Sequence, residues 1–147
     1  MDNVQNPTPA RLRTLPSWSI NQVAIAANRL TDRALAETGS RRHHFAMLAA
    51  LEEFGPSSQA DLGRCTGIDR SDVVAAINAM AERGFVERNP DPSNGRRNIV
   101  TITAAGKDHL ENLSALLCDA QAQLLRTLSA TESKTLTELL SRILDSR

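Results

Sequence analysis

The sequence has few aromatic residues, few cysteines and no excess of charge of either sign. Its 147 residues include one tryptophan, three phenylalanines and no tyrosine. Proteins that read single-stranded RNA stack bases on exposed aromatic rings, so this composition disfavours that class. With 17 basic and 17 acidic residues, the formal net charge is zero, which disfavours a protein that coats nucleic acid or anionic membrane through bulk charge. A nucleic-acid interface would have to concentrate its positive charge in one place.

Membrane, cofactor and catalytic signals are also missing. The two cysteines, Cys65 and Cys118, lack Cys-x-x-Cys spacing, which is typical of a reduced cytoplasmic protein. The longest apolar run, 45–51, is too short to cross a bilayer, and the N-terminus lacks the apolar segment of a signal peptide. There is no glycine-rich phosphate loop, nucleophile motif or paired-carboxylate helix. We therefore expect no membrane segment, cofactor, metal site or enzymatic activity.

Hydrophobic spacing predicts four helices, a β-hairpin and two further helices within 17–147. Residues 1–16 are polar and contain three prolines, so we expect a flexible N-terminal arm there. Apolar residues recur every three or four positions in the helical stretches. The predicted N-terminal caps are Ser17, Ser40, Ser58, Asp69, Thr103 and Ser129. Residues 85–103 form the hairpin, and Asn94-Gly95 is expected to supply a positive-φ turn.

A short helix, a glycine turn at Gly67 and a second capped helix predict a helix-turn-helix, which the hairpin makes winged. At 100° per residue, the second helix should bury Val73, Val74, Ile77, Met80 and Ala81. The opposite face carries Ser71, Asp72, Ala75, Ala79 and Glu82. Small side chains there would let the helix enter a DNA major groove. The alternative is that alanines merely favour helix.

One feature of the sequence argues against DNA binding and another argues for it. Asp72 opposes it, because a carboxylate repels phosphate unless it accepts from cytosine N4; alternatively, it only stabilises the first turn. Arg70 lies toward the core side by angle but is close enough to reach a phosphate. Residues 94–107 contain Arg96, Arg97 and one lysine but no acid. Arginines on a protruding hairpin suit a narrow minor groove, whereas the alternative is a solvated hairpin with charged edges.

Residues 45–106 resemble the multiple-antibiotic-resistance regulator (MarR) family, most specifically in the motifs GIDRSDV, ERGFVER, DPSNGRR and TITAAG. The opening LSATES resembles the family's last helix. The resemblance implies a mainly α winged helix-turn-helix fold with a small β-hairpin. It implies a homodimer formed through N- and C-terminal helices (17–38 and 104–147) around a DNA-binding lobe (40–103). The implied function is a ligand-responsive repressor on a palindromic operator in double-stranded DNA.

By position, the resemblance implies roles for individual residues. Ser71 and its neighbours would enter the major groove, Arg96 the minor groove, and Ser58 and Gln59 would approach phosphates. The predicted DNA-binding residues are Ser58, Gln59, Arg70, Ser71, Asp72, Ala75, Arg96 and Arg97. Asn94 departs from the family, whose wing commonly has an aspartate that holds the arginine. Asp72 also departs, because a small hydroxyl residue is common there.

The leucine rows of the terminal helices exceed what the winged unit can cover, which independently predicts an interface. The family's effector cleft lies between dimer helices and lobe, and a small anionic or aromatic effector would pair with arginine or histidine or stack on tryptophan. The predicted ligand-binding residues are Arg13, Trp18, Asn21, His43 and His44. Alternatives are a protein-interaction module without DNA binding and a redox-responsive regulator using Cys65 or Cys118, although buried, inert thiols are expected.

Overall fold

The computed structural model describes residues 7–146 and divides the chain into two compact units. One unit comprises the chain up to residue 30 together with everything from 121 onward, and the other comprises 31–120. The lobe predicted over 40–103 lies wholly within the second unit. Two helices, α2 (Pro16–Leu35) and α6 (Ala104–Leu124), contribute residues to both units.

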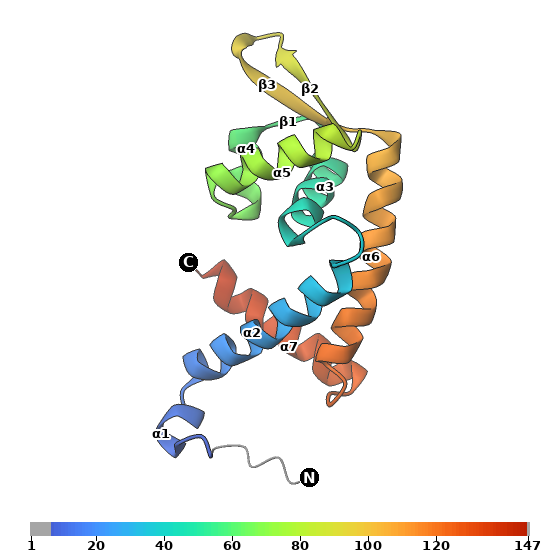
Figure 1. The fold of residues 1–147 in the computed structure, drawn as a ribbon. Coiled ribbons are helices and arrows are strands. Elements are labelled where there is room, and N and C mark those ends of the chain that lie inside the picture. Colours follow the sequence, from blue (N-terminus) through green and yellow to red (C-terminus); the bar gives the residue numbers. More distant parts are fainter. Residues whose placement is uncertain (1–6, 147) are drawn as a thin grey trace. The chain divides into compact units, whose positions relative to one another are not determined.

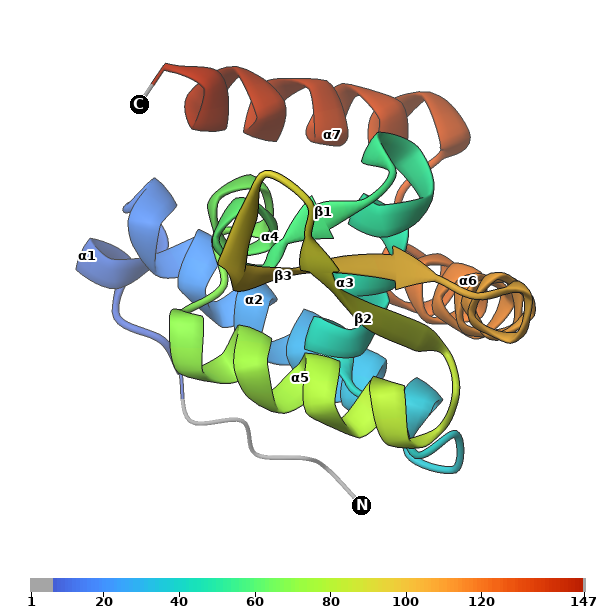
Figure 2. The ribbon, with the colours of Figure 1, turned by 90° about the horizontal axis from the view of Figure 1, so that it is seen from above.

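The 31–120 unit is a winged helix-turn-helix (Figure 1). Its complete elements are α3 (Arg42–Phe54), β1 (Ser57–Ser58), α4 (Gln59–Thr66), α5 (Arg70–Glu82), β2 (Val86–Asp91) and β3 (Asn94–Ile102). The strands form an antiparallel sheet in the order β1-β3-β2. Seen from above, the strands lie between α4 and α5, and α5 runs along β2 (Figure 2). The predicted mainly α fold with a small hairpin is confirmed.

The core of this unit draws on every layer. Leu48 of α3, Leu62 of α4, Ile77 of α5, Val100 of β3 and Leu113 of α6 are each fully buried. Complete burial of such a side chain is worth about 1.5–3 kcal/mol. One contiguous core therefore holds α4 and α5 beneath the hairpin, which makes the helix-turn-helix a rigid platform.

Local capping signals explain where the helix-turn-helix elements begin and end. The Ser58 hydroxyl accepts from the Asp61 backbone N–H at 3.1 Å, and α4 ends at Gly67, whose φ of 71° few other residues adopt. Asp69 then caps α5 by accepting from the Ser71 N–H at 3.3 Å. These predicted caps are confirmed.

Two later caps are confirmed as well. The Thr103 hydroxyl accepts from the Gly106 N–H at 3.0 Å, at the start of α6. Ser129 and Glu132 form a reciprocal capping box that opens α7 (Ala130–Asp145). Both signals act over three residues, which is why the sequence reveals them.

The other unit consists of helices with apolar residues left at the surface. It contains α1 (Ala10–Arg13), most of α2, the end of α6, and α7. Its exposed large apolar side chains are Leu12, Leu15, Ile20, Val23, Ile25, Leu139, Leu140, Ile143 and Leu144. Among the described helices, none is long and apolar enough to span a membrane.

Several element boundaries differ from prediction. Residues 10–13 form α1 within the expected arm, and α2 begins at Pro16, because proline favours the first helical turn. The rest of the expected arm, residues 1–6, lies outside the described residues. Ser40 does not cap α3; Arg41 occupies that position, because the Ser40 hydroxyl is buried and bonded to His109 and Arg83. Strand β1 was not predicted, since two residues carry no periodicity.

The predicted hairpin turn is also wrong. Residues 92–93 make the turn, whereas Asn94 and Gly95 begin β3. The positive-φ glycines of the described chain do not include Gly95. Proline pre-sets the turn dihedral, and Asp91 accepts from the Ser93 N–H at 2.9 Å, so the chain reverses two residues early.

Candidate nucleic-acid interface

Helix α5 presents one buried face and one exposed ridge. Val73, Ala76, Ile77 and Met80 are buried. The predicted core face is therefore confirmed for Val73, Ile77 and Met80. Val74 and Ala81, also predicted there, are only partly buried, and Ala76 is buried although it was not predicted to be. The exposed residues are Arg70, Ser71, Asp72, Ala75, Asn78 and Glu82, of which Ser71 and Ala75 have the shortest side chains. A ridge with these short side chains at its N-terminal end can approach DNA bases closely.

The start of α5 orients a hydroxyl on this ridge. The Ser71 Oγ donates to Asp69 Oδ2 at 2.6 Å, and the Ser71 N–H donates to the same oxygen. Both bonds stabilise the carboxylate and lower the pKa of Asp69. The Ser71 hydroxyl is thus fixed at the end of the helix that normally meets base edges.

An arginine-lined cleft lies between the start of α4, the α4–α5 turn and β3. It has a volume of about 620 Å³. Its polar walls include Ser58, Gln59, Arg64, Arg70, Arg96 and Arg97. The tertiary structure thus brings five of the predicted DNA-binding residues together, from segments up to 39 positions apart. Arg64 is an addition that the sequence had not indicated.

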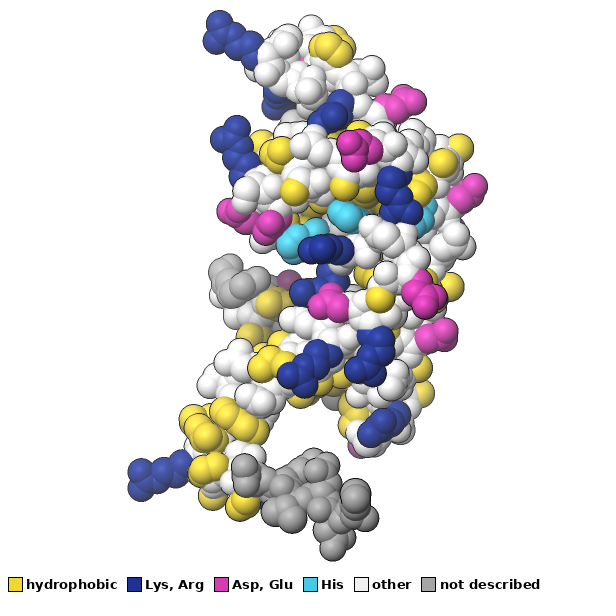
Figure 3. Space-filling model, in the orientation of Figure 1, with side chains coloured by type: hydrophobic (Ala, Val, Ile, Leu, Met, Phe, Trp, Pro, Cys, Tyr) yellow, Lys and Arg dark blue, Asp and Glu magenta, His cyan; other side chains and the backbone are white. Residues whose placement is uncertain are grey.

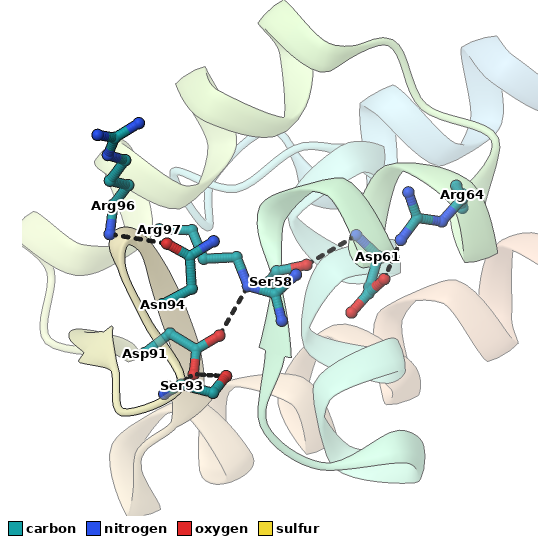
Figure 4. Close-up of polar contacts among 8 residues, drawn as sticks. All are labelled: Ser58, Asp61, Arg64, Asp91, Ser93, Asn94, Arg96 and Arg97. Carbon is teal, nitrogen blue, oxygen red and sulfur yellow. Dashed lines mark hydrogen bonds and ion pairs between the residues drawn. The ribbon is translucent and has the colours of Figure 1, made fainter.

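The two wing arginines are not equivalent (Figure 4). Arg97 Nε donates to Asp91 Oδ2 at 2.7 Å, and the buried Asp91 also accepts from the Ser93 hydroxyl at 2.8 Å. The Arg97 bond and then the Ser93 bonds lower the pKa of Asp91 to about 2, and the same carboxylate raises the pKa of Arg97. Arg97 is therefore a held cation at the base of the wing.

Arg96 points its guanidinium away from the hairpin (Figure 4). Its backbone N–H donates to Asn94 Oδ1 at 3.2 Å, whereas its side chain has no ion pair among the residues that the structure describes. Asn94 therefore orders the backbone beneath Arg96, and Asp91 holds the neighbouring arginine. Sequence reasoning missed Asp91; its signal was the Asp-x-Ser spacing of an Asx turn.

Charges at the start of α4 are partly compensated. Asp61 pairs with Arg64, one helical turn later. Hydrogen bonding with Ser58 and then with Arg64 lowers the pKa of Asp61. On the face shown in Figure 3, Lys and Arg side chains are scattered among Asp and Glu side chains. Positive charge is concentrated only locally, as the zero net charge required.

Asp72 of α5 does not line the arginine-lined cleft. It lines a second cavity of about 620 Å³, whose wall also includes Ser40, Arg41, Arg42 and His43. Arg42 is paired with Asp32 at 3.0 Å. We call this second cavity, which Asp72 lines, the α3–α5 cavity. Asp72 lies 100° from Ser71 around the helix, so it sits at the edge of the ridge.

Of the predicted ligand residues, only His43 lines the α3–α5 cavity. His44 is on the same helix, where burial and then Arg41 lower its pKa. Arg13 lies in α1, and Trp18 and Asn21 lie in α2, all within the other compact unit.

Both cysteines are exposed, contrary to the expected burial. Cys65 is on the solvent side of α4, and its thiol contacts the Leu62 carbonyl oxygen at 3.5 Å. Within residues 7–146, no cluster of three metal-ligating side chains occurs.

Known proteins match this chain over its winged unit and beyond. The sequence profile of the MarR family matches residues 38–97. A probable transcriptional regulator from Pseudomonas aeruginosa is 32% identical, with a TM-score of 0.82, and the match covers 90% of this chain and 99% of that one. The chain belongs to the MarR family.

Two further comparisons give context. The transcriptional repressor NicR of Pseudomonas putida is 30% identical over 102 residues, which are 69% of this chain. This match spans 65% of NicR, slightly under two thirds of its length. The structure of BpsR from Bordetella bronchiseptica, 20% identical with a TM-score of 0.83 over 94% of this chain and 99% of BpsR, shares the fold.

Proposed function

We propose that this MarR-family protein is a cytoplasmic, sequence-specific transcription regulator: a ligand-responsive repressor that binds a palindromic operator as a homodimer. The observation that carries the proposal is the arginine-lined cleft beside the exposed ridge of α5. NicR is named a repressor, and BpsR is described as a DNA-binding protein regulated by 6-hydroxynicotinic acid. The role is regulatory rather than enzymatic.

The geometry supports a different DNA contact for each element of the winged unit. Ser71 and Ala75 on the ridge of α5 face base edges in the major groove. Ser58 and Gln59 at the N-terminus of α4 approach phosphates, because unpaired backbone N–H groups favour anions there. Arg96, whose guanidinium has no ion pair within residues 7–146, enters the adjacent minor groove. Arg97 stays at the wing base, where Asp91 orients it.

Footprinting on the DNA that flanks the protein's own gene tests this proposal. We expect protection of two half-sites about one helical turn, roughly 10 bp, apart. Arg96→Ala should weaken operator binding by at least about 1 kcal/mol, roughly fivefold. Arg126→Ala, an exposed arginine outside the winged unit, is the control. Absence of any footprint, or an Arg96→Ala variant that binds as tightly as the wild type, would contradict the proposal.

Homodimerisation is supported by the apolar side chains left exposed on α2 and α7. Val23 is 52% exposed, and Ile143 and Leu144 are 56% and 54% exposed. Exposed apolar surface of this extent marks an association surface. Sedimentation should show a dimer, and Ile143→Glu should shift it toward monomer. A wild-type monomer at micromolar concentration would contradict the architecture.

The effector is proposed to be a small aromatic or anionic acid. Arg41 and His43 in the α3–α5 cavity offer partners for a carboxylate; Arg13, Trp18, Asn21 and His44 remain predictions for the same role. Calorimetric titration with 6-hydroxynicotinic acid and related aromatic acids tests this. Trp18→Ala and Arg41→Ala should each weaken binding, and unchanged affinity in either would remove that residue from the site.

A further inference from the structure

A second arginine contact lies on the exposed side of α5, outside the arginine-lined cleft. Arg88 of β2 donates through Nη1 to the Asn78 Oδ1 of α5. Both residues are exposed. They are ten positions apart, so only the packing of β2 along α5 brings them together. We call the two side chains the Arg88–Asn78 clamp.

The position of the clamp follows from the alternation of β2. Val86 and Arg88 share one face of the strand, and Val86 is buried against the core. Arg88 therefore extends on the same face toward α5 and meets Asn78 there. Asn78 lies on the exposed ridge within 60° of Ser71 and Ala75, taking 100° per residue.

The Arg88–Asn78 clamp offers more hydrogen-bond donors than acceptors. Arginine only donates hydrogen bonds, so the Asn78 oxygen must face it, and the Asn78 NH₂ group points elsewhere. One of the two lone pairs of that oxygen is thereby occupied. Besides the second lone pair of that oxygen, what remains is the Asn78 NH₂ together with the other guanidinium N–H groups of Arg88, so donors outnumber acceptors. A free asparagine reads adenine with one acceptor and one donor, and here the guanidinium of Arg88 already occupies one side of that acceptor.

The charge of Arg88 is not compensated. Among residues 7–146, no ion pair of Arg88 occurs, although Glu82 follows Asn78 by one turn of α5. Arg97 by contrast is bound to a buried carboxylate. A cation held in place by a neutral partner keeps its full attraction for an anion while losing less conformational freedom on binding.

We propose that the Arg88–Asn78 clamp binds a backbone phosphate of the operator at the C-terminal half of α5. This rests on the proposed function. In a helix-turn-helix the N-terminal residues of the recognition helix reach the bases, and its later residues meet the backbone. Asn78 lies in that later half, and an array made mostly of donors, with a cation among them, matches phosphate oxygens. The clamp thus sets the orientation of α5 from the end opposite Ser71.

The experiment measures operator affinity between 50 and 200 mM salt for wild type, Arg88→Ala and Asn78→Ala. Asn89→Ala, the next residue along β2 and exposed on the other face, is the matched control, together with Arg126→Ala. For each clamp engaged, Arg88→Ala should make the slope of log affinity against log salt shallower by about 0.9. The ratio of wild-type affinity to Arg88→Ala affinity then falls by about 3.5-fold between 50 and 200 mM salt. Thermal melts verify that each variant is folded.

Asn78→Ala separates orientation from charge. It keeps the cation, so the salt slope should stay at the wild-type value, while affinity falls about threefold at every salt concentration. Operators with single neutral methylphosphonate linkages locate the contact. At one linkage per half-site, replacing the charged phosphate by methylphosphonate should weaken operator binding by the wild-type protein but leave binding by Arg88→Ala unaffected.

Equal salt slopes for wild type and Arg88→Ala would overturn the proposal, even with the footprint intact. It would also be overturned if a single 7-deazaguanine in the operator reproduced the Arg88→Ala defect, because the contact would then be to a guanine edge. A wild-type protein that protects no DNA would instead refute the proposed function itself.

Discussion

Replacing Gly106 by alanine tests how closely α6 is packed against the start of the wing. A Cβ at this position would lie 2.1 Å from the Phe85 carbonyl oxygen and 2.9 Å from Ile102 Cγ1. The same carbonyl accepts from the Thr103 N–H at 3.0 Å, and the Thr103 hydroxyl donates to the Gly84 carbonyl at 2.6 Å. The first turn of α6 must therefore move away from Phe85, and both bonds are lost.

The expected cost of Gly106→Ala can be assembled from these contacts. Overpacking a close-packed site costs about 1–3 kcal/mol, and two lost hydrogen bonds cost about 1 kcal/mol each. Alanine recovers about 1 kcal/mol through its higher helix propensity. The net loss in free energy of unfolding is thus about 2–4 kcal/mol.

Urea denaturation at a fixed protomer concentration measures this loss, because the stability of a dimer depends on concentration. Gly95→Ala is the matched control. Nothing lies within 4 Å of its Cβ position, and its φ is not positive, so we expect a change between zero and a gain of about 1 kcal/mol. If Gly106→Ala lost less than about 0.5 kcal/mol, the inferred close contact between α6 and Phe85 would be incorrect.

Three further predictions concern the core and two titrating groups. Ile77→Ala, at a fully buried position in α5, should lower the free energy of unfolding by about 2–5 kcal/mol in the same urea assay. The pKa of Asp91 is lowered to about 2, so its stabilisation of the wing is present above the unfolded pKa near 4 and is lost as pH falls toward 2. NMR titration of Ser93 and Arg97 should show this, and a midpoint near 4 would refute it. Burial and then Arg83 lower the pKa of His109, so stability should fall as pH drops below about 6.5; His109→Gln should reduce that dependence, and an unaltered pH profile would count against it.

Much of the helix-turn-helix could be predicted because its signals are local. The Asp69 cap, the Gly67 turn and the buried face of α5 each depend on residues within one or two turns. The predicted turn at Asn94-Gly95 is wrong although an Asn-Gly pair is a strong local signal, because the neighbouring turn at residues 92–93, closed by the bond from the Ser93 N–H to Asp91, reverses the chain instead. Ser40 failed differently, because its partner His109 is 69 positions away.

The sequence by itself determined the order of the elements other than α1 and β1, the caps of α4, α5, α6 and α7, and the family motifs. Capping and periodicity act over three to seven residues, so they are written in consecutive letters. Only the tertiary structure decided which arginine is held and which is free. The Asp91–Arg97 pair and the Arg88–Asn78 clamp arise where separate elements meet, and no spacing rule within one element specifies such contacts. The few charged contacts of this neutral chain therefore acquire their separate roles through packing.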